Sequence, residues 1–363
     1  MARISLSVIN DLVSDQRVHR IASALQAQGH QVSLIGRLLP TSPSLSDRPY
    51  QTRRMKLRFT HGKLFYLEYN WRLFWVLLRS KNEIMVANDL DTLLANYLAS
   101  KLKGARLVYD THEYFTEVPE LINRPRNRNI WLRLEQWLFP KLKTAYTVNT
   151  SIAEIYKEKY GVDVQVIRNV PFRQQPNLSS SKENILIYQG ALNLGRGIQL
   201  MIDAMEFLPD CVLWIFGGGD LEQDLRAHAS TKAWKSRVVF HGRYPFEQLF
   251  EWTCQAKLGF SLEEDLGANY HFASPNKVYD YIQAGVPVLV SDLPEMRRTA
   301  ETYGVGEVLE DEERSPEKLA KRIAGMLANK EKYQGYVQNC IQAGSELNWE
   351  KEKKKLLALY EEV

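Results

Sequence analysis

The first half of the chain alternates short hydrophobic runs with helical patterns. ARISLSVI, QVSLIGR, EIMVAN, RLVYDT and AYTVNT are rich in apolar residues, and polar turns bound each of them. QRVHRIASALQAQGH and DTLLANYLASKLKG instead repeat apolar residues every three or four positions, as one face of a helix does. We expect the first of these helices to end near Gly29. Buried strands separated by helices are typical of a parallel sheet covered on both faces.

The second half repeats this pattern. Its predicted strands are NILIYQG, CVLWIFGGG, RVVFHG, AKLGFSL and PVLVSD, with helical segments between them. The segment RNVPFRQQPNLSSSKEN, residues 168–184, has two prolines and a run of serines, which favours a linker. We therefore predict an α/β protein of two doubly wound, Rossmann-like domains, residues 1–170 and 171–345, facing one another across a cleft. A C-terminal helix over residues 346–363 is expected to pack back on the first domain.

Composition excludes several classes of protein. The three cysteines, Cys211, Cys254 and Cys340, are widely separated, which argues against a disulfide framework or a zinc site and favours the cytoplasm. The opening MARISLSVIN is typical of a strand and not of a signal peptide. Polar residues interrupt the most hydrophobic segment, residues 64–80, so we do not expect it to span a bilayer.

Charge is unevenly distributed. Residues 1–170 sum to +10 and residues 171–363 to −6, which suggests two domains with different partners. No nucleic-acid-binding motif is recognisable, so nucleic acid is not an expected partner.

Two basic segments, residues 48–59 and 123–143, combine cations with aromatic rings. The rings are those of Tyr50, Phe59, Trp131, Trp137 and Phe139. Arg124, Arg126 and Arg128 are predicted to share a loop. Such segments suit peripheral contact with an anionic membrane, at about 1 kcal/mol per basic residue at most. The alternative is that Trp131, Leu134 and Leu138 face the core at helical spacing while the charges are solvated.

The turn GALNLGRG, residues 190–197, is the first candidate site. Its first six positions fit the phosphate loop G-x-x-x-x-G-K-[S/T], but Arg196 and Gly197 replace the lysine and the hydroxyl residue. Gly195 and Gly197 would let backbone N–H groups approach an anion at a helix start, and Arg196 could bind a phosphate bidentately. The alternative is a tight turn with a solvated arginine.

Two more turns follow predicted strands. FGGGD, residues 216–220, lacks the third glycine of a dinucleotide fingerprint, so we interpret Gly217 and Gly218 as a flexible turn at the rim of the site. FHGRY, residues 240–244, could read a base edge through its backbone, with Tyr244 stacking on the base. His241 alone is more often structural.

The segment SPNKVYDYIQAGVPVLVSD, residues 274–292, is the strongest candidate. Ser274 is a predicted N-cap, Pro275 the first helical residue, and Gly285 marks the helix end. Lys277 and Asp280 share a helix face. A lysine in the first turn opposes the helix dipole unless an anion binds there, and Asp280 could accept the hydroxyls of a ribose. The alternative is a capped helix with an ion pair between Lys277 and Asp280.

In order and spacing, these segments resemble GT-B glycosyltransferases, in particular the large retaining family of bacterial mannosyl-, glucosyl- and N-acetylglucosaminyl-transferases. GALNLGRG, FGGG, SLEE and KVYDYIQAGVPVLVS stand where that family has its G-R-L…K-G turn, G-x-G loop, S-x-x-E and helix ending in G-x-P-V-I. Residues 10–37 and VYDTHEYFTEVPEL are similar to its opening and to its D-x-H-E segment. The likeness covers nearly the whole chain.

The resemblance implies a function in polysaccharide biosynthesis. Residues 171–345 would bind a UDP- or GDP-sugar, and residues 1–170 a glycan or a lipid-linked acceptor. Transfer would proceed with retention and without a cofactor or metal, because cations and helix N-termini stabilise the leaving diphosphate. No protein nucleophile is then needed, since the leaving phosphate can take the acceptor's proton.

The resemblance also implies the site residues. His112, Arg196 and Lys277 are the expected catalytic residues, and His112 resembles the family histidine that contacts the donor sugar across the cleft. The expected donor contacts are Gly195, Arg196, Gly197, Gly217, Gly218, Arg243, Tyr244, Asn276, Lys277 and Asp280. Sugar or acceptor contacts are expected from Asn10, Asp11, Glu113 and Glu264. For the acids that follow strands, capping of the next helix is the alternative, and it is the expected role of Asp89.

Departures from the family leave the donor sugar open. Ala191 replaces the arginine of G-R-L, Arg196 replaces a lysine, and Asp280 replaces a glutamate. Fifteen residues instead of seven separate Glu264 from Asp280. Two other functions therefore stay open: a nucleotide-sugar 2-epimerase of similar fold, and an inactive protein that binds nucleotide sugars.

Overall fold

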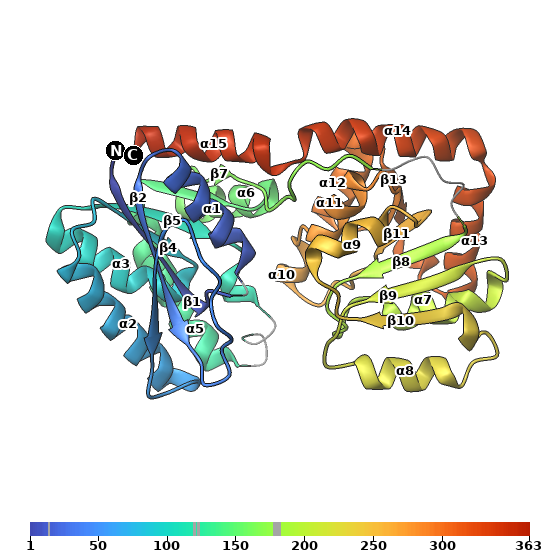
Figure 1. Cartoon of the computed structure of the whole chain (residues 1–363). Coiled ribbons are helices and arrows are strands. Elements are labelled where there is room, and N and C mark those ends of the chain that lie inside the picture. Colours follow the sequence, from blue (N-terminus) through green and yellow to red (C-terminus); the bar gives the residue numbers. More distant parts are fainter. Residues whose placement is uncertain (14, 119–120, 122–123, 177–182) are drawn as a thin grey trace. The chain divides into compact units, whose positions relative to one another are not determined.

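The computed structural model describes residues 1–13, 15–118, 121, 124–176 and 183–363. They form two compact units: residues 1–169 with 352–363, and residues 170–351 (Figure 1). Each unit has one parallel sheet, and the predicted pair of Rossmann-like α/β domains is confirmed.

The first unit contains a seven-stranded sheet in the order β3-β2-β1-β4-β5-β6-β7. Its strands are β1 (Arg3–Asp11), β2 (Gln31–Leu38), β3 (Gln51–Lys56), β4 (Ile84–Asn88), β5 (Arg106–Thr111), β6 (Thr144–Thr147) and β7 (Gln165–Val166). Its helices are α1 (Gln16–Ala27), α2 (Gly62–Arg79), α3 (Leu90–Lys103), α5 (Pro125–Leu138) and α6 (Thr150–Tyr160). The strand order reverses between β1 and β4, where the carboxyl ends of an open sheet form a ligand site in many α/β proteins.

The second unit contains a six-stranded sheet in the order β10-β9-β8-β11-β12-β13. Its strands are β8 (Ile185–Gln189), β9 (Val212–Phe216), β10 (Val238–Gly242), β11 (Leu258–Ser261), β12 (Val288–Ser291) and β13 (Gly306–Leu309). Its helices are α7 (Ile198–Ala204), α8 (Glu222–Ser230), α9 (Phe246–Thr253), α10 (Ala268–His271), α11 (Asn276–Gln283), α12 (Pro294–Tyr303), α13 (Pro316–Ala328) and α14 (Lys330–Glu346). Here the order reverses between β8 and β11.

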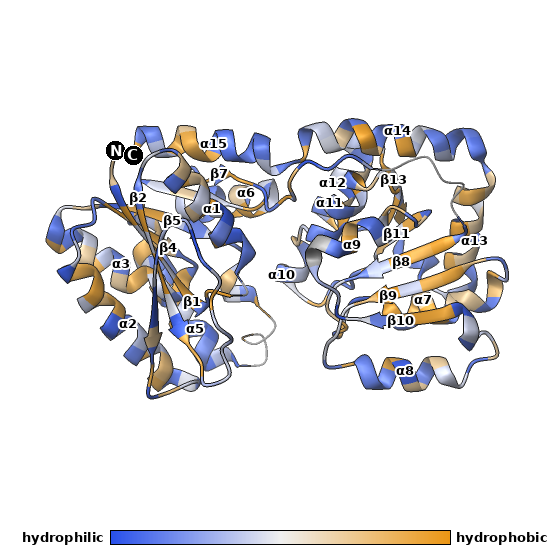
Figure 2. Ribbon diagram, in the orientation of Figure 1, coloured by the Kyte–Doolittle hydropathy of each residue, from blue (hydrophilic) through white to orange (hydrophobic). Residues whose placement is uncertain are grey.

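The strands form because their side chains are apolar on both faces. Every residue of β4, β8, β11 and β12 is buried, and Figure 2 shows β8 and β9 as mainly hydrophobic ribbons. In the second unit, separate apolar clusters pack on the two faces of the sheet: Leu186 and Leu213 belong to one, and Ile187 and Val288 to the other. Alternate residues of a strand point to opposite faces, so both faces need hydrophobic cover.

The last helix, α15 (Trp349–Glu362), joins the two units along the chain. The N–H of Trp349 donates to the carbonyl of Pro171, within the second unit. From Glu352 onward the helix belongs to the first unit. Glu352 is buried there and accepts from the backbone N–H of Arg168 at 2.9 Å. Leu356 and Tyr360 are buried as well.

Three local predictions are wrong. Helix α11 begins at Asn276 with Pro275 as its cap residue, and the Ser274 hydroxyl bonds to the Tyr279 hydroxyl instead of capping the helix. Arg126 and Arg128 lie in α5, which begins at Pro125, and not in a loop. Arg128 also forms an ion pair with Glu117.

The aromatic residues of the basic segments divide between core and surface. Tyr50, Leu138 and Phe139 are buried, Trp131 and Leu134 are half-buried, and Phe59 and Trp137 are exposed. Residues 64–80 fall mostly in α2, and among the described residues no helix is long and apolar enough to cross a membrane.

Candidate active site

The predicted phosphate turn lies at the carboxyl edge of the second sheet. Gly190, Gly195 and Gly197 all have positive φ, and Gly197 precedes the first residue of α7. A Cβ on Gly197 would lie 2.4 Å from the carbonyl oxygen of Leu262, so the turn packs against the segment after β11. The N–H of Glu264 donates to the carbonyl of Gly195 at 2.9 Å and joins the same two segments. Only glycine satisfies both the backbone angles and the close packing here.

Two predicted cations meet on one carboxylate beneath this turn. Lys277 Nζ lies 2.6 Å, and Arg196 Nη1 3.3 Å, from Glu263 Oε1. Ser261 donates to the other oxygen of Glu263 at 2.7 Å. The Lys277 ammonium also lies 4.4 Å from the centre of the Tyr188 ring. The turn after β8, the end of β11 and the start of α11 therefore form one charged cluster.

Burial sets the electrostatics of this cluster. Burial alone would raise the pKa of Glu263, but Lys277 and Arg196 lower it below its ordinary value. Burial lowers the pKa of Lys277, and Glu263 opposes that shift. With all three groups ionised, the cluster carries one net positive charge. Arg196 keeps 27% of its side chain exposed, which leaves it accessible to an incoming anion.

The remaining donor residues line the neighbouring strand ends. A Cβ on Gly217 would lie 1.8 Å from the carbonyl oxygen of Gly190, so the two glycine turns touch. The N–H of Gly217 donates to the carbonyl of Gly242 at 2.8 Å, next to Arg243. Arg243 is exposed, and its Nε lies 2.7 Å from where a Cβ of Gly218 would be. The structure thus brings the three predicted turns together.

Tyr244 packs on an aromatic cluster at the ends of β9 and β10. Its ring meets Phe216 and Trp252 edge-on at 5.7 and 5.9 Å, and Phe216 stacks on His241 at 4.3 Å. Nε2 of His241 is buried and has no hydrogen-bond partner in the described part of the chain, and burial lowers the pKa of this ring. A neutral histidine inside an aromatic cluster agrees with a structural role.

Asp280, Asn276 and Glu264 lie outside the charged cluster. Asp280 accepts from Gln189 Nε2 at 3.1 Å, at the end of β8, and it is half-buried. Asn276 is exposed at the first position of α11, and Glu264 is half-buried. Lys277 forms its ion pair with Glu263, and not with Asp280 as the alternative interpretation predicted.

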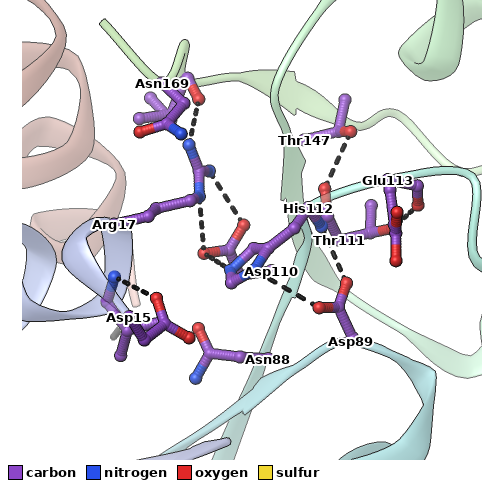
Figure 3. Close-up of polar contacts among 12 residues, drawn as sticks. Asp15, Arg17, Asn88, Asp89, Asp110, Thr111, His112, Glu113, Thr147 and Asn169 are labelled. Atoms are coloured by element: carbon purple, nitrogen blue, oxygen red, sulfur yellow. Dashed lines mark hydrogen bonds and ion pairs between the residues drawn. The ribbon is translucent and has the colours of Figure 1, made fainter. Parts of the chain in front are cut away.

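In the first unit, His112 is held between two carboxylates (Figure 3). Its Nδ1 lies 3.3 Å from Asp89 and its Nε2 3.0 Å from Asp110. Asp89 also accepts from the His112 backbone N–H at 2.8 Å. Asp110 is fully buried and is held from its other side by Arg17, with contacts of 2.9 and 3.3 Å.

This arrangement keeps His112 positively charged. Burial would lower the pKa of His112, but Asp89 and Asp110 raise it to about 10. Both ring nitrogens are committed to carboxylates, so the ring has no lone pair with which to act as a base. His112 can therefore supply a fixed charge, but not general-base catalysis.

Asp89 does not cap α3 as predicted. It occupies the cap position, but its carboxylate turns to His112 and makes no capping hydrogen bond. Its φ of 61° is the only positive φ at a non-glycine residue in the described ranges. Such a conformation is costly and is often found at functional sites.

Of the other residues predicted in the first unit, Asp11 and Asn10 lie outside the cluster of His112, Asp89 and Asp110, and Glu113 lies beside it. Asp11 is buried and pairs with Arg54 at 3.0 Å, and it also accepts from Ser42. Asn10 is exposed. Glu113 directly follows His112, and its carbonyl accepts from Thr111 at 2.8 Å. Of the predicted residues here, only Glu113 adjoins His112.

Sequence reasoning missed Glu263, Asp110 and Arg17 as structural partners. The S-x-x-E spacing indicates Glu264 and not its neighbour Glu263. Arg17 lies at i−4 and i−8 from Ile21 and Leu25, on the buried face of α1. A charge on an apolar helix face signals a buried partner, and this signal could have found Arg17. No group of three His, Cys, Asp or Glu side chains among the described residues is placed to hold a metal ion.

Several solved structures have the same fold as this chain. Sucrose-phosphate synthase from Thermosynechococcus elongatus matches with a TM-score of 0.81 at 16% identity, covering 100% of this chain and 99% of that one. HepE of Anabaena, in complex with UDP and glucose, matches with a TM-score of 0.75 at 14% identity, covering 100% of both chains. WaaG, a glycosyltransferase involved in lipopolysaccharide biosynthesis, matches with a TM-score of 0.69 at 15% identity. The match covers 97% of this chain and 98% of that one. At these identities the likeness shows the fold.

Family models identify both units. Residues 15–170 match Glycosyltransferase Family 4, and residues 169–343 match Glycosyl transferases group 1. No curated protein sequence matches the chain significantly. With two family models in sequence and the same fold in the solved structures, the chain belongs to the glycosyltransferases of the GT-B fold.

Proposed function

We propose that this enzyme transfers a sugar from a nucleoside diphosphate sugar, with retention and without a metal ion, to a glycan or lipid-linked acceptor. The observation that supports this most is the buried cluster of Glu263 with Arg196 and Lys277 at a glycine-rich turn. Its net charge is positive, and Gly197 of the turn directly precedes α7. A diphosphate is the anion that best fits two adjacent cations and a helix N-terminus.

The cluster supplies what the chemistry requires. When the bond between the anomeric carbon and the phosphate oxygen breaks, its electron pair stays on the nucleoside diphosphate, which gains negative charge. Arg196 and Lys277 stabilise that charge, and because Glu263 holds both in place, little reorganisation is needed. The acceptor hydroxyl forms the new bond to the same face of the sugar, and its proton passes to the leaving phosphate oxygen. No protein base takes part in this scheme.

The rest of the second unit is assigned to the nucleoside. We assign Asp280 to the ribose hydroxyls, and Arg243 and Tyr244 to the base. Two solved structures of the same fold contain uridine nucleotides: HepE with UDP, and a trehalose-6-phosphate protein from E. coli with UDP-2-fluoro glucose. They favour UDP over GDP in the proposal.

The first unit is assigned to the acceptor. Its charge of +10 suits an anionic acceptor or the anionic face of the cell membrane. We place the enzyme in the cytoplasm, in peripheral contact with that membrane. His112 would act in this unit as a fixed cation.

Incubation with a panel of UDP- and GDP-sugars tests the proposal. Slow release of nucleoside diphosphate is the expected result, and Arg196→Ala should weaken UDP binding by about 1.5–3 kcal/mol, as for one charge-assisted hydrogen bond. Arg298→Ala, which removes an exposed arginine of α12 that pairs with Glu295, is the control and should leave the affinity for UDP unchanged. An epimerised sugar would point to a 2-epimerase, and binding without turnover to an inactive protein.

A further inference from the structure

A hollow in the first unit is lined by side chains that the proposed transfer chemistry does not use. Helix α3 packs against both α2 and α5, and the hollow is lined by residues of all three. Its volume is about 830 Å³. Sites for small organic molecules commonly have this size.

The walls of the hollow are apolar. They include Tyr66 and Leu67 from α2, Leu94 from α3, and Ile130, Trp131 and Trp137 from α5. Leu67, Ile130 and Trp137 are 67%, 54% and 48% exposed. Large apolar side chains gathered at an open surface mark binding sites more often than chance.

Part of the wall is held rigidly. The Trp131 ring meets Tyr66 edge-on at 5.0 Å and Phe115 at 5.3 Å. Asn70, from α2, donates to the carbonyl of Asp91, in α3, at 2.8 Å. These contacts keep the hollow open, so that a ligand need not create it.

Cations surround the apolar walls. Lys63, Arg124 and Arg133 line the hollow and are exposed, and within the described residues none of them forms an ion pair. Arg128, in the first turn of α5, is different because it forms an ion pair with Glu117, which neutralises its charge. Three uncompensated cations at one opening attract an anion.

One buried carboxyl group faces the same space. Asp91 is the only acidic residue among the described residues of the lining, and it is 6% exposed. Its Oδ1 has no hydrogen-bond partner in the described structure. Burial and the nearby Asp89 raise its pKa well above the ordinary value. A neutral carboxyl group can donate to a ligand oxygen and does not repel an anion.

We infer that this hollow binds the lipid part of the acceptor, a hydrocarbon chain that ends in a phosphate. The chain would lie on Leu67, Ile130 and Trp137, and the phosphate on Lys63, Arg124 and Arg133. This inference rests on the proposed function, because it takes the first unit to bind the acceptor. A concave site fits a single chain, whereas a bilayer surface would meet protruding residues such as Trp71, which is 63% exposed on α2 and lies outside the hollow.

Calorimetric titration of the full chain with farnesyl phosphate tests the inference. Farnesol lacks the phosphate and inorganic phosphate lacks the chain, and farnesyl phosphate should bind at least about tenfold more tightly than either. Ile130→Trp fills the hollow and should weaken binding by about tenfold or more. Changing Arg124 and Arg133 together to Gln should reduce the affinity to that of farnesol. Trp71→Ala is the matched control and should bind normally.

Two results would overturn the inference. One is equal affinity for farnesyl phosphate and farnesol, and the other is undiminished binding by Ile130→Trp. Adsorption to anionic vesicles that depends on Trp71, without binding of farnesyl phosphate, would likewise replace it with a general membrane contact. Titration of the same variants with UDP distinguishes a failure of this inference from a failure of the proposed function. A protein that binds farnesyl phosphate but not UDP refutes the donor site and leaves the lipid site standing.

Discussion

Replacing Glu263 with Gln preserves the size of the side chain but removes the charge that two cations share. Lys277 and Arg196 both approach the same oxygen of Glu263, at 2.6 and 3.3 Å. Removing one partner of a buried ion pair costs about 3–5 kcal/mol, because the other charge stays buried. Arg196 is 27% exposed and water screens it, so most of the cost arises at Lys277, which is 9% exposed.

Lys277 can limit this cost by releasing its proton. Its ordinary pKa is 10.5, so neutralising it at pH 7 costs about 5 kcal/mol, at 1.36 kcal/mol per pH unit. Burial already lowers the pKa of Lys277 in the folded protein, and loss of Glu263 lowers it further. The unfolded chain then binds more protons than the folded one. The stability of the Glu263→Gln variant should therefore rise with pH, up to about pH 10.

Scanning calorimetry measures the effect, and UDP gives it a functional readout. A loss of about 3 kcal/mol lowers the melting temperature of a unit of this size by about 6–12 °C. Phosphate oxygens can replace the missing carboxylate beside Lys277 and Arg196. A saturating concentration of UDP should therefore raise the melting temperature of the variant by more than that of the wild type.

Glu264→Gln is the matched control, because the next carboxylate along the chain takes no part in the ion pair. It should melt within about 1 °C of the wild type, because Glu264 is half-buried and has no charged partner among the residues that the structure describes. The reasoning is refuted if Glu263→Gln also melts with the wild type. It is refuted equally if UDP stabilises the variant and the wild type to the same extent.

Three further predictions concern protonation, the nucleoside and metal ions. His112 should stay protonated between about pH 6 and pH 9 in an NMR titration, because its pKa is raised to about 10, and Asp89→Asn should lower that pKa. The stability that this charge contributes is complete below the ordinary value of 6.5 and is lost as the pH rises through about 10; a ring that titrates near pH 7 would contradict the geometry. Asp280→Asn should weaken the binding of UDP much more than that of 2′-deoxy-UDP, and equal losses would leave Asp280 a structural residue. Release of UDP from a UDP-sugar should continue in excess EDTA, whereas activity that EDTA abolishes and Mg²⁺ or Mn²⁺ restores would exclude the metal-free mechanism.

The sequence predicts the buried strands and the edge strand β10, but it misses the other three edge strands. Every residue of β4 and β8 is apolar or buried, and both were expected from their hydrophobic runs. Strand β3, with the sequence QTRRMK, lies at the edge of its sheet with most side chains exposed, so it has no hydrophobic pattern to detect. Strands β7 and β13 are also edge strands and are short. Their existence depends on the neighbouring strand and not on their own residues.

The residues of the candidate site also fall into two groups: those that local sequence predicts, and those that only contacts between distant segments determine. Arg196 and Lys277 are detectable because glycines or a helix start surround them. Their common partner Glu263 is not, because the choice between it and Asp280 depends on how β11 meets α11. Asp89 shows the limit most clearly. Its position predicts a helix cap, but the tertiary contact with His112 overrides the local preference.

The placement of α15 has a consequence for the order in which the protein can be made. Residues 352–363 belong to the first unit but leave the ribosome after the whole of the second unit. Until then the surface that Leu356 and Tyr360 bury is open, and Arg168 lacks Glu352. During synthesis the second unit can therefore reach its final packing before the first, which is the reverse of the usual order for two consecutive domains. A chain truncated after residue 351 should accordingly carry a folded second unit and a first unit that is still sensitive to protease.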